Sequence, residues 1–212
     1  MRRLVPFALL ALALAAPASA FVEPVTKSGD LDGDADRETV RARPVGPPKD
    51  FQRTEVRVRD RCPATVDRRI APVHDNLETL RLKRADRRKG SEVFMILRDG
   101  ARGVLGEARL VAWRPRAGAV CREPKPLFVY DSDRHTRTPR GGNGDIAFFT
   151  ASIRDITKRF RGLEIAIDER FTRSSDPPSF GSIKKVTYWR YSVKSDRYLH
   201  YRTVVRHLKQ PG

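Results

Sequence analysis

Hydrophobic and polar residues alternate along much of this chain, which is the pattern of β-strands with one buried face. Val40 and Ala42 alternate with polar residues over 38–43, and Val56 and Val58 do so over 54–59. The segment 93–97 is apolar at every position, which indicates a central strand buried on both faces. Further strands are expected at 79–83, 107–114, 127–130, 163–167, 186–193 and 198–208.

The segment 146–160 fits two patterns. Phe149, Ile153, Ile156 and Phe160 have helical spacing, whereas Phe149, Ala151 and Ile153 also have strand spacing. We favour a strand because the neighbouring segments are strands. About nine or ten short strands, separated by turn residues, are typical of all-β folds. We therefore expect antiparallel sheets, arranged as a sandwich or as partial propeller-like blades.

The first residues have the features of an export signal. Arg2 and Arg3 precede a short apolar run at 4–16, and Ala18-Ser19-Ala20 is a small-residue cleavage motif. We interpret 1–20 as a signal peptide and 21–212 as a single secreted β domain. The apolar run is too short to span a bilayer, and no later stretch is long enough, so no transmembrane segment is expected.

The chain has two cysteines, Cys62 and Cys121. An even number of cysteines in an exported protein usually indicates a disulfide, although two free buried thiols are the alternative. A bond between them would close a loop of about 60 residues and, by the loop-entropy model, stabilise the fold by roughly 4 kcal/mol.

The formal net charge is +17. A strongly basic surface is suited to anionic polymers, such as a cell-envelope polymer or another polyanion. The alternative is a merely soluble, arginine-rich surface. If the first strands share a sheet, their outward positions form a basic band, which consists of Arg41, Arg43, Arg57, Arg59, Arg81 and Lys83.

The most specific motif is the acidic run at 30–40, which enters a predicted strand. It has carboxylates at alternate positions: Asp30, Asp32, Asp34, Asp36 and Glu38. Ca²⁺ takes six to eight oxygen ligands, and a tight loop of this kind can direct several oxygens to one point. An EF-hand would need glycine and glutamate where Ala35 and Arg41 stand, and no helix pattern flanks the run.

This run resembles the calcium loops of FG-GAP/VCBS-type repeats. The matching residues are Asp30, Asp32, Gly33, Asp34, Glu38 and Val40, and Ala35 replaces the second glycine of that motif. The resemblance implies a secreted β protein with one structural Ca²⁺ or none, and it does not imply a catalytic activity. The alternative is a solvated acidic turn without metal, but mutual repulsion of the carboxylates favours a ligand.

A weaker copy of the motif follows at 85–94. When Glu92 is aligned with Glu38, Asp86 aligns with Asp32, while Arg84 and Arg88 replace Asp30 and Asp34. We interpret this segment as a degenerate copy that cannot hold a cation.

One further group of residues suggests catalysis. Asp131, Asp133 and His135, followed by Asn143 and Asp145, loosely resemble a metal-nuclease motif. Phosphodiester cleavage uses a histidine base and a hard cation. A polar surface loop is the other interpretation, and no enzyme active site is otherwise evident. We expect a non-catalytic exported protein with a binding or envelope-associated role; the alternative is a basic extracellular hydrolase or nuclease.

Overall fold

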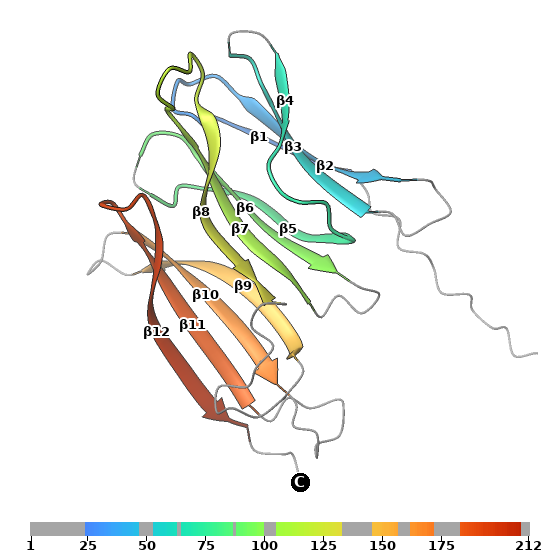
Figure 1. Ribbon diagram of the computed structural model, residues 1–212, viewed down its shortest axis with the longest axis vertical. Helices are drawn as coiled ribbons and strands as arrows, with labels where there is room; N and C mark the ends of the chain where they lie inside the picture. The colour runs from blue at the N-terminus through green and yellow to red at the C-terminus, as the bar shows by residue number, and fades with distance from the viewer. Residues whose placement is uncertain are drawn as a thin grey trace, which may run out of the picture.

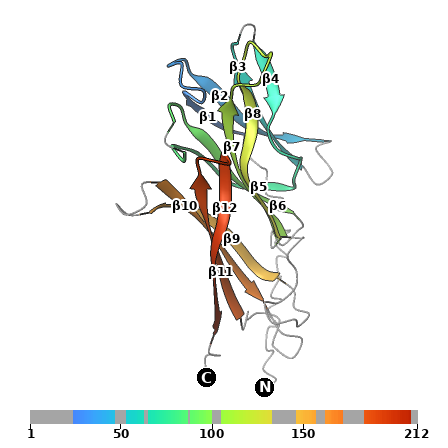
Figure 2. The same cartoon turned by 60° about the vertical axis from the view of Figure 1, so that its left-hand side comes forward.

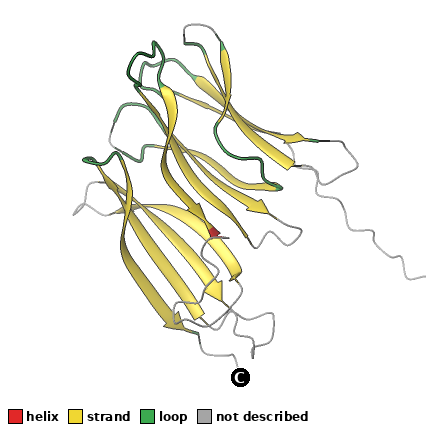
Figure 3. Ribbon diagram, in the orientation of Figure 1, coloured by secondary structure: helices red, strands yellow, loops and turns green. Residues whose placement is uncertain are grey.

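The structure, a computed structural model, describes residues 24–46, 53–62, 65–86, 88–99, 105–132, 146–156, 162–171 and 183–208. Strands make up most of these residues (Figure 3). They form three four-stranded antiparallel sheets, and in each sheet the strands lie side by side in the order of the chain. The predicted all-β class with antiparallel sheets is confirmed.

The three sheets follow one another along the sequence. The first contains β1 (Val25–Gly29), β2 (Glu38–Val45), β3 (Arg53–Asp60) and β4 (Val66–Arg69). The middle sheet contains β5 (Asn76–Lys83), β6 (Glu92–Asp99), β7 (Leu105–Arg114) and β8 (Glu123–Asp131). The third contains β9 (Ile146–Ile156), β10 (Gly162–Phe171), β11 (Ile183–Ser192) and β12 (Arg197–His207).

The middle sheet lies between the other two and is buried on both faces (Figures 1 and 2). The central strand β6 shows how: Val93, Met95 and Leu97 pack against the first sheet, whereas Phe94 and Ile96 pack against the third. A strand that is buried on both faces needs no polar alternation, which explains its continuous apolar sequence. The chain thus builds two similar sheet-to-sheet interfaces.

Sequence pattern located most strands but missed two. β1 and β4 are short and carry mostly polar residues, so neither has a recognisable alternation. In the ambiguous segment, the strand prediction is confirmed for Ile146–Ile156, and 157–160 lie outside the described residues. The predicted hairpin around 194–197 is confirmed by the pairing of β11 with β12.

The proposed signal peptide, residues 1–20, lies outside the described part of the chain and stays a prediction. In the part that is described, no helix has the length and hydrophobicity needed to cross a membrane.

Candidate functional site

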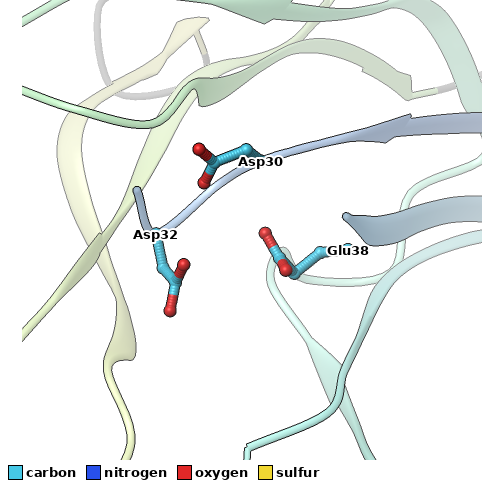
Figure 4. Close-up of side chains that lie close together, drawn as sticks. All are labelled: Asp30, Asp32 and Glu38. Carbon is cyan, nitrogen blue, oxygen red and sulfur yellow. The ribbon is translucent and has the colours of Figure 1, made fainter. Parts of the chain in front are cut away.

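The loop between β1 and β2 gathers three carboxylates. Asp30 and Asp32 lie on the segment that leaves β1, and Glu38 is the first residue of β2 (Figure 4). One carboxylate oxygen from each of the three lies within 4.8 Å of the others. Two oxygens bound to one Ca²⁺ at 2.3–2.6 Å are separated by at most about 5 Å, so this spacing suits a shared calcium ion.

Hydrogen bonds to the backbone hold the loop in this shape. Gly33 N–H donates to Asp30 Oδ1 at 2.5 Å, and Leu31 N–H donates to Glu38 Oε2 at 2.5 Å. Gly33 and Ala35 have φ of +86° and +77°. Glycine adopts this left-handed region freely, whereas alanine is strained there. The tight turn is therefore formed even though Ala35 stands where the motif that this loop resembles has glycine.

The carboxylates in this loop are costly to keep charged. Asp32 is 8% exposed and Glu38 is 4% exposed. Burial, together with the charges of Asp32, Asp34 and Asp60, raises the pKa of Glu38 to about 7, although the hydrogen bond from Leu31 N–H lowers it. Burial and the neighbouring Asp34 carboxyl also raise the pKa of Asp32. The loop concentrates negative charge, which a bound cation would stabilise.

Two of the five predicted ligands do not join this group. Asp34 Oδ1 accepts a hydrogen bond from Asp36 N–H at 2.8 Å, and both residues are exposed. Asp34 is not in the group of carboxylates within 4.8 Å of one another, but its carboxyl is near enough to that of Asp32 to raise its pKa, so its role as a ligand stays a prediction. Asp34 N–H instead donates to Asp32 Oδ1 at 3.1 Å and so helps to orient that carboxylate.

Two residues near the loop were not identified from the sequence. Asp60, the last residue of β3, is buried, and its charge raises the pKa of Glu38. Arg122, which precedes β8, donates a hydrogen bond from its guanidinium to the backbone carbonyl of Asp32. Both are distant from the loop in sequence, so no local motif could have pointed to them.

The loop between β5 and β6 repeats the same hydrogen-bond scheme. Ala85 N–H donates to Glu92 Oε2 at 2.5 Å, and Arg88 N–H donates to Asp86 Oδ1 at 2.8 Å. Each donor and acceptor lies 54 residues after its counterpart in the first loop. The two loops are in contact, since Ser91 N–H donates to the Asp30 carbonyl at 2.8 Å.

The second loop already holds a positive group from the protein. Asp86 forms a buried salt bridge with Arg114, the last residue of β7. Arg114 Nε also lies 3.2 Å from Asp196 Oδ2, in the turn before β12, and Lys125 Nζ lies 2.9 Å from the same oxygen. Burial would raise the pKa of Asp196, but hydrogen bonds from Lys125 and Tyr191 and the charges of Arg114 and Arg88 lower it to about 2.

The two cysteines come together beside the first loop. Cys62 follows β3, and Cys121 is buried just before β8. They are free thiols in this structure and lie close enough to interact. The interaction with Cys121 and burial raise the pKa of Cys62 to about 11. The disulfide stays a prediction, with its two partners in contact.

The predicted basic band is divided between two sheets. Arg41, Arg43, Arg57 and Arg59 do lie on the outer face of the first sheet. Arg81 and Lys83 lie on β5 in the middle sheet, where Arg81 pairs with Phe94 on the side facing the third sheet. The premise that these strands share one sheet is therefore wrong, because the first sheet ends with β4.

The outer face of the first sheet also carries acidic residues. Glu55 forms salt bridges with Arg43 at 3.3 Å and with Arg57 at 2.8 Å. Asp67 pairs with Arg57 at 2.9 Å. Arg41 and Arg59 form no salt bridge with other residues that the structure describes. They are the arginines of the band whose charge is least neutralised.

A second basic surface lies on the outer face of the third sheet. The guanidinium of Arg190 lies 3.8 Å from the centre of the Tyr201 ring, and that of Arg202 lies 5.7 Å from the centre of the Tyr188 ring. Tyr201 is 38% exposed. Sequence reasoning placed most aromatic residues in the core, which is correct for Trp113, but periodicity could not tell which face of β11 and β12 would be covered.

The residues of the nuclease alternative cannot be placed together. Asp133, His135, Asn143 and Asp145 lie outside the described residues, whereas Asp131 ends β8. His200 Nε2 is 2.9 Å from Thr203 Oγ1 and its ring packs edge-on against Trp189. In the described part of the chain, the only group of three or more metal-ligating side chains is Asp30, Asp32 and Glu38.

No protein-family model matches this chain, and neither curated proteins nor solved structures give a match. The resemblance to FG-GAP/VCBS repeats therefore stays a prediction from the loop residues.

Proposed function

We propose that this protein is an exported, non-catalytic β module whose first loop binds a structural Ca²⁺. The observation that supports this most directly is the convergence of Asp30, Asp32 and Glu38 within 4.8 Å. Carboxylates are the preferred ligands of hard cations, and backbone carbonyls and water complete the coordination shell in such loops. The ion would offset the repulsion between buried acids that are adjacent in space.

The second loop supports this assignment by contrast. There the same backbone arrangement surrounds a carboxylate that is neutralised by Arg114. In the first loop, Arg122 contacts the Asp32 backbone carbonyl, and Asp32 is in none of the salt bridges between described residues. An external cation would serve there the role that the guanidinium serves in the second loop.

Thermal unfolding with and without calcium tests the proposal. A cation that binds only the folded protein stabilises it by mass action. The melting temperature should rise in millimolar CaCl₂ and return to its starting value with excess EGTA. MgCl₂ at the same concentration is the control for ionic strength and for hard cations that demand stricter geometry. A midpoint that does not respond to CaCl₂ contradicts the proposal.

We also propose that the module binds anionic polymers through the outer face of the first sheet. Arg41 and Arg59, together with exposed Arg69 on β4, support this role. Each phosphate contact releases counterions, so affinity should fall steeply with salt concentration. The carboxylates of Glu55 and Asp67 limit the affinity and argue against a tight, specific complex.

Heparin and double-stranded DNA, titrated at low and moderate salt, test this second role. The Arg41→Glu/Arg59→Glu variant should weaken binding and flatten the salt dependence. The matched control is Arg202→Glu/Arg206→Glu, which reverses two exposed charges on the third sheet. If the control weakens binding as much as the first variant, the site is not on the first sheet.

A further inference from the structure

Two segments from different sheets meet beside the acidic loop. The first runs from the end of β3 into β4 and includes Cys62; the second precedes β8 and includes Cys121. The Cys62 and Cys121 side chains are close enough for Cys121 to raise the pKa of the Cys62 thiol. Independently, Arg68 on β4 forms a salt bridge with Glu123 on β8 at 3.9 Å. The two cysteines are therefore brought together by the packing of the first sheet on the middle sheet.

We propose that Cys62 and Cys121 form a reversible disulfide that fixes the first sheet to the middle sheet and controls the affinity of the acidic loop for calcium. The second half of this proposal rests on the proposed calcium site. The first half, a covalent clamp that orders the loop, does not require the metal.

The interface between the middle and third sheets shows what a residue at the position of Cys62 can do. Val58 pairs with Val40 in the first sheet, as Leu110 pairs with Phe94 in the middle sheet. Cys62 lies four residues after Val58, and Arg114 lies four residues after Leu110. The two residues therefore occupy corresponding positions in their sheets. Arg114 reaches the turn before β12 and pairs with Asp196 there.

Cys62 makes the corresponding connection, since it reaches the turn before β8 and meets Cys121. One interface is thus joined by an ion pair and the other by two thiols at the same place in the fold. Oxidation would convert the second connection into a covalent one.

The cysteine pair has direct routes to the loop. Arg122 follows Cys121 in the chain and donates a hydrogen bond to the Asp32 carbonyl. Asp60 lies two residues before Cys62, and its charge acts on Glu38. A bond between the cysteines would fix both neighbours. The loop would then be held in its binding shape before the cation arrives, and preorganisation of this kind raises affinity.

The chemistry is thiol–disulfide exchange with a small-molecule or protein disulfide as oxidant. Cys62 is the more exposed of the two, and its thiolate attacks the external disulfide and releases one thiol. The Cys121 thiolate then attacks Sγ of Cys62 in the mixed disulfide and releases the second thiol. Two electrons pass to the oxidant, which becomes two thiols with the two protons lost by the cysteines.

The test compares the full chain after treatment with oxidised glutathione and after reduction with TCEP, with Cys62→Ser/Cys121→Ser as a permanently reduced control. Mass spectrometry after alkylation counts the free thiols. Isothermal titration with CaCl₂ gives the dissociation constant. Hydrogen exchange of the 31–36 amides without calcium reports the order of the loop.

We expect no alkylated cysteine after oxidation, slower loop exchange, and calcium binding tighter by about fivefold or more, which is the lower range for coupled sites. The serine variant should match the reduced protein under both conditions. By linkage, saturating calcium should make the disulfide harder to reduce by the same factor.

Two outcomes would overturn the proposal. Cysteines that remain free with oxidised glutathione would exclude the disulfide. Equal calcium affinity and equal loop exchange in the oxidised and reduced proteins would show that the disulfide does not control the loop. A third outcome separates the two proposals: slower loop exchange on oxidation without calcium binding in either form supports the clamp and refutes the calcium site.

Discussion

The first and second loops of this protein have the same backbone arrangement but opposite chemistry. In both, a glutamate at the start of the next strand accepts a hydrogen bond from a backbone N–H seven residues earlier. The first loop surrounds this glutamate with aspartates. In the second, arginines replace two of the four aspartates and Gly90 replaces a third, and Arg114 pairs with the one that is kept, Asp86.

The comparison suggests two ways of neutralising the buried carboxylates of such a loop. The second loop is neutralised by residues of the neighbouring strands, so its stability is part of the fold. In the first loop, no described residue forms a salt bridge with Asp32, although the charge of Arg122 lowers its pKa, and we propose that a bound cation supplies the missing neutralisation. Changes in the two loops should therefore have different effects, and only those in the first should depend on calcium.

The largest expected effect on stability comes from removing the Arg114 guanidinium, which neutralises Asp86 in the second loop. Arg114→Met leaves Asp86, which is 3% exposed, buried without its partner. Removing one member of a buried ion pair typically costs about 3–5 kcal/mol. Urea unfolding should show this loss with or without calcium. The exposed Arg59→Met variant is the control, expected to change stability by about 0.5 kcal/mol or less. A similar small loss for Arg114→Met would show that the second loop does not depend on the guanidinium.

The next effect distinguishes the two glutamates. At calcium concentrations of 100 times the dissociation constant, the wild-type protein should gain about 2.7 kcal/mol of stability. Glu38→Gln removes a proposed ligand, so this gain should disappear. Glu92→Gln alters the corresponding residue of the second loop and should leave the gain intact. Differential scanning fluorimetry with CaCl₂ and EGTA measures both. Equal calcium responses in the two variants would contradict the assignment of the site to the first loop.

A smaller effect depends on pH. The pKa of Asp196 is lowered from 3.8 to about 2, so its ion pairs stabilise the folded protein above pH 4 and this contribution is lost as the pH falls through 2. After allowance for partial exposure, Asp196 contributes about 1–2 kcal/mol at neutral pH. Asp196→Asn should therefore be less stable than the wild type at pH 6, and the difference should shrink towards pH 2. Urea unfolding of both proteins over this range checks the prediction; a constant difference would refute it.

The smallest effect sharpens the description of the first loop. Ala35 has a φ of +77°, which costs an L-residue roughly 1–2 kcal/mol, part of which glycine loses again through its greater freedom in the unfolded chain. Ala35→Gly should therefore stabilise the protein by about 0.5 kcal/mol without loss of calcium binding. Gly33→Ala is the opposing control, because its new Cβ would lie 2.7 Å from Lys89 Cβ. Destabilisation by Ala35→Gly in thermal melts would show that the turn is not strained.

Local pattern was sufficient for most of the strands and for the three central carboxylates of the acidic loop, but it missed β1 and β4. Alternation places Val40 and Val58 inward because side chains of a strand point to opposite faces in turn. The spacing of Asp30, Asp32 and Glu38 determines that they can meet across one short turn, and the turn residues lie within the same few positions. The same local reasoning could not foresee that the backbone N–H and the carboxyl of Asp34 would form hydrogen bonds with Asp32 and Asp36.

Only the tertiary structure decided which strands share a sheet and which faces of the three sheets pack against each other. It separates Arg81 and Lys83 from the other basic residues, and it brings Cys62 to Cys121 and Arg114 to both Asp86 and Asp196. These relations join residues 28 to 82 positions apart in the chain. Periodicity reports whether a face is buried, but not against which sheet. That choice depends on how the apolar faces of all three sheets are covered at once.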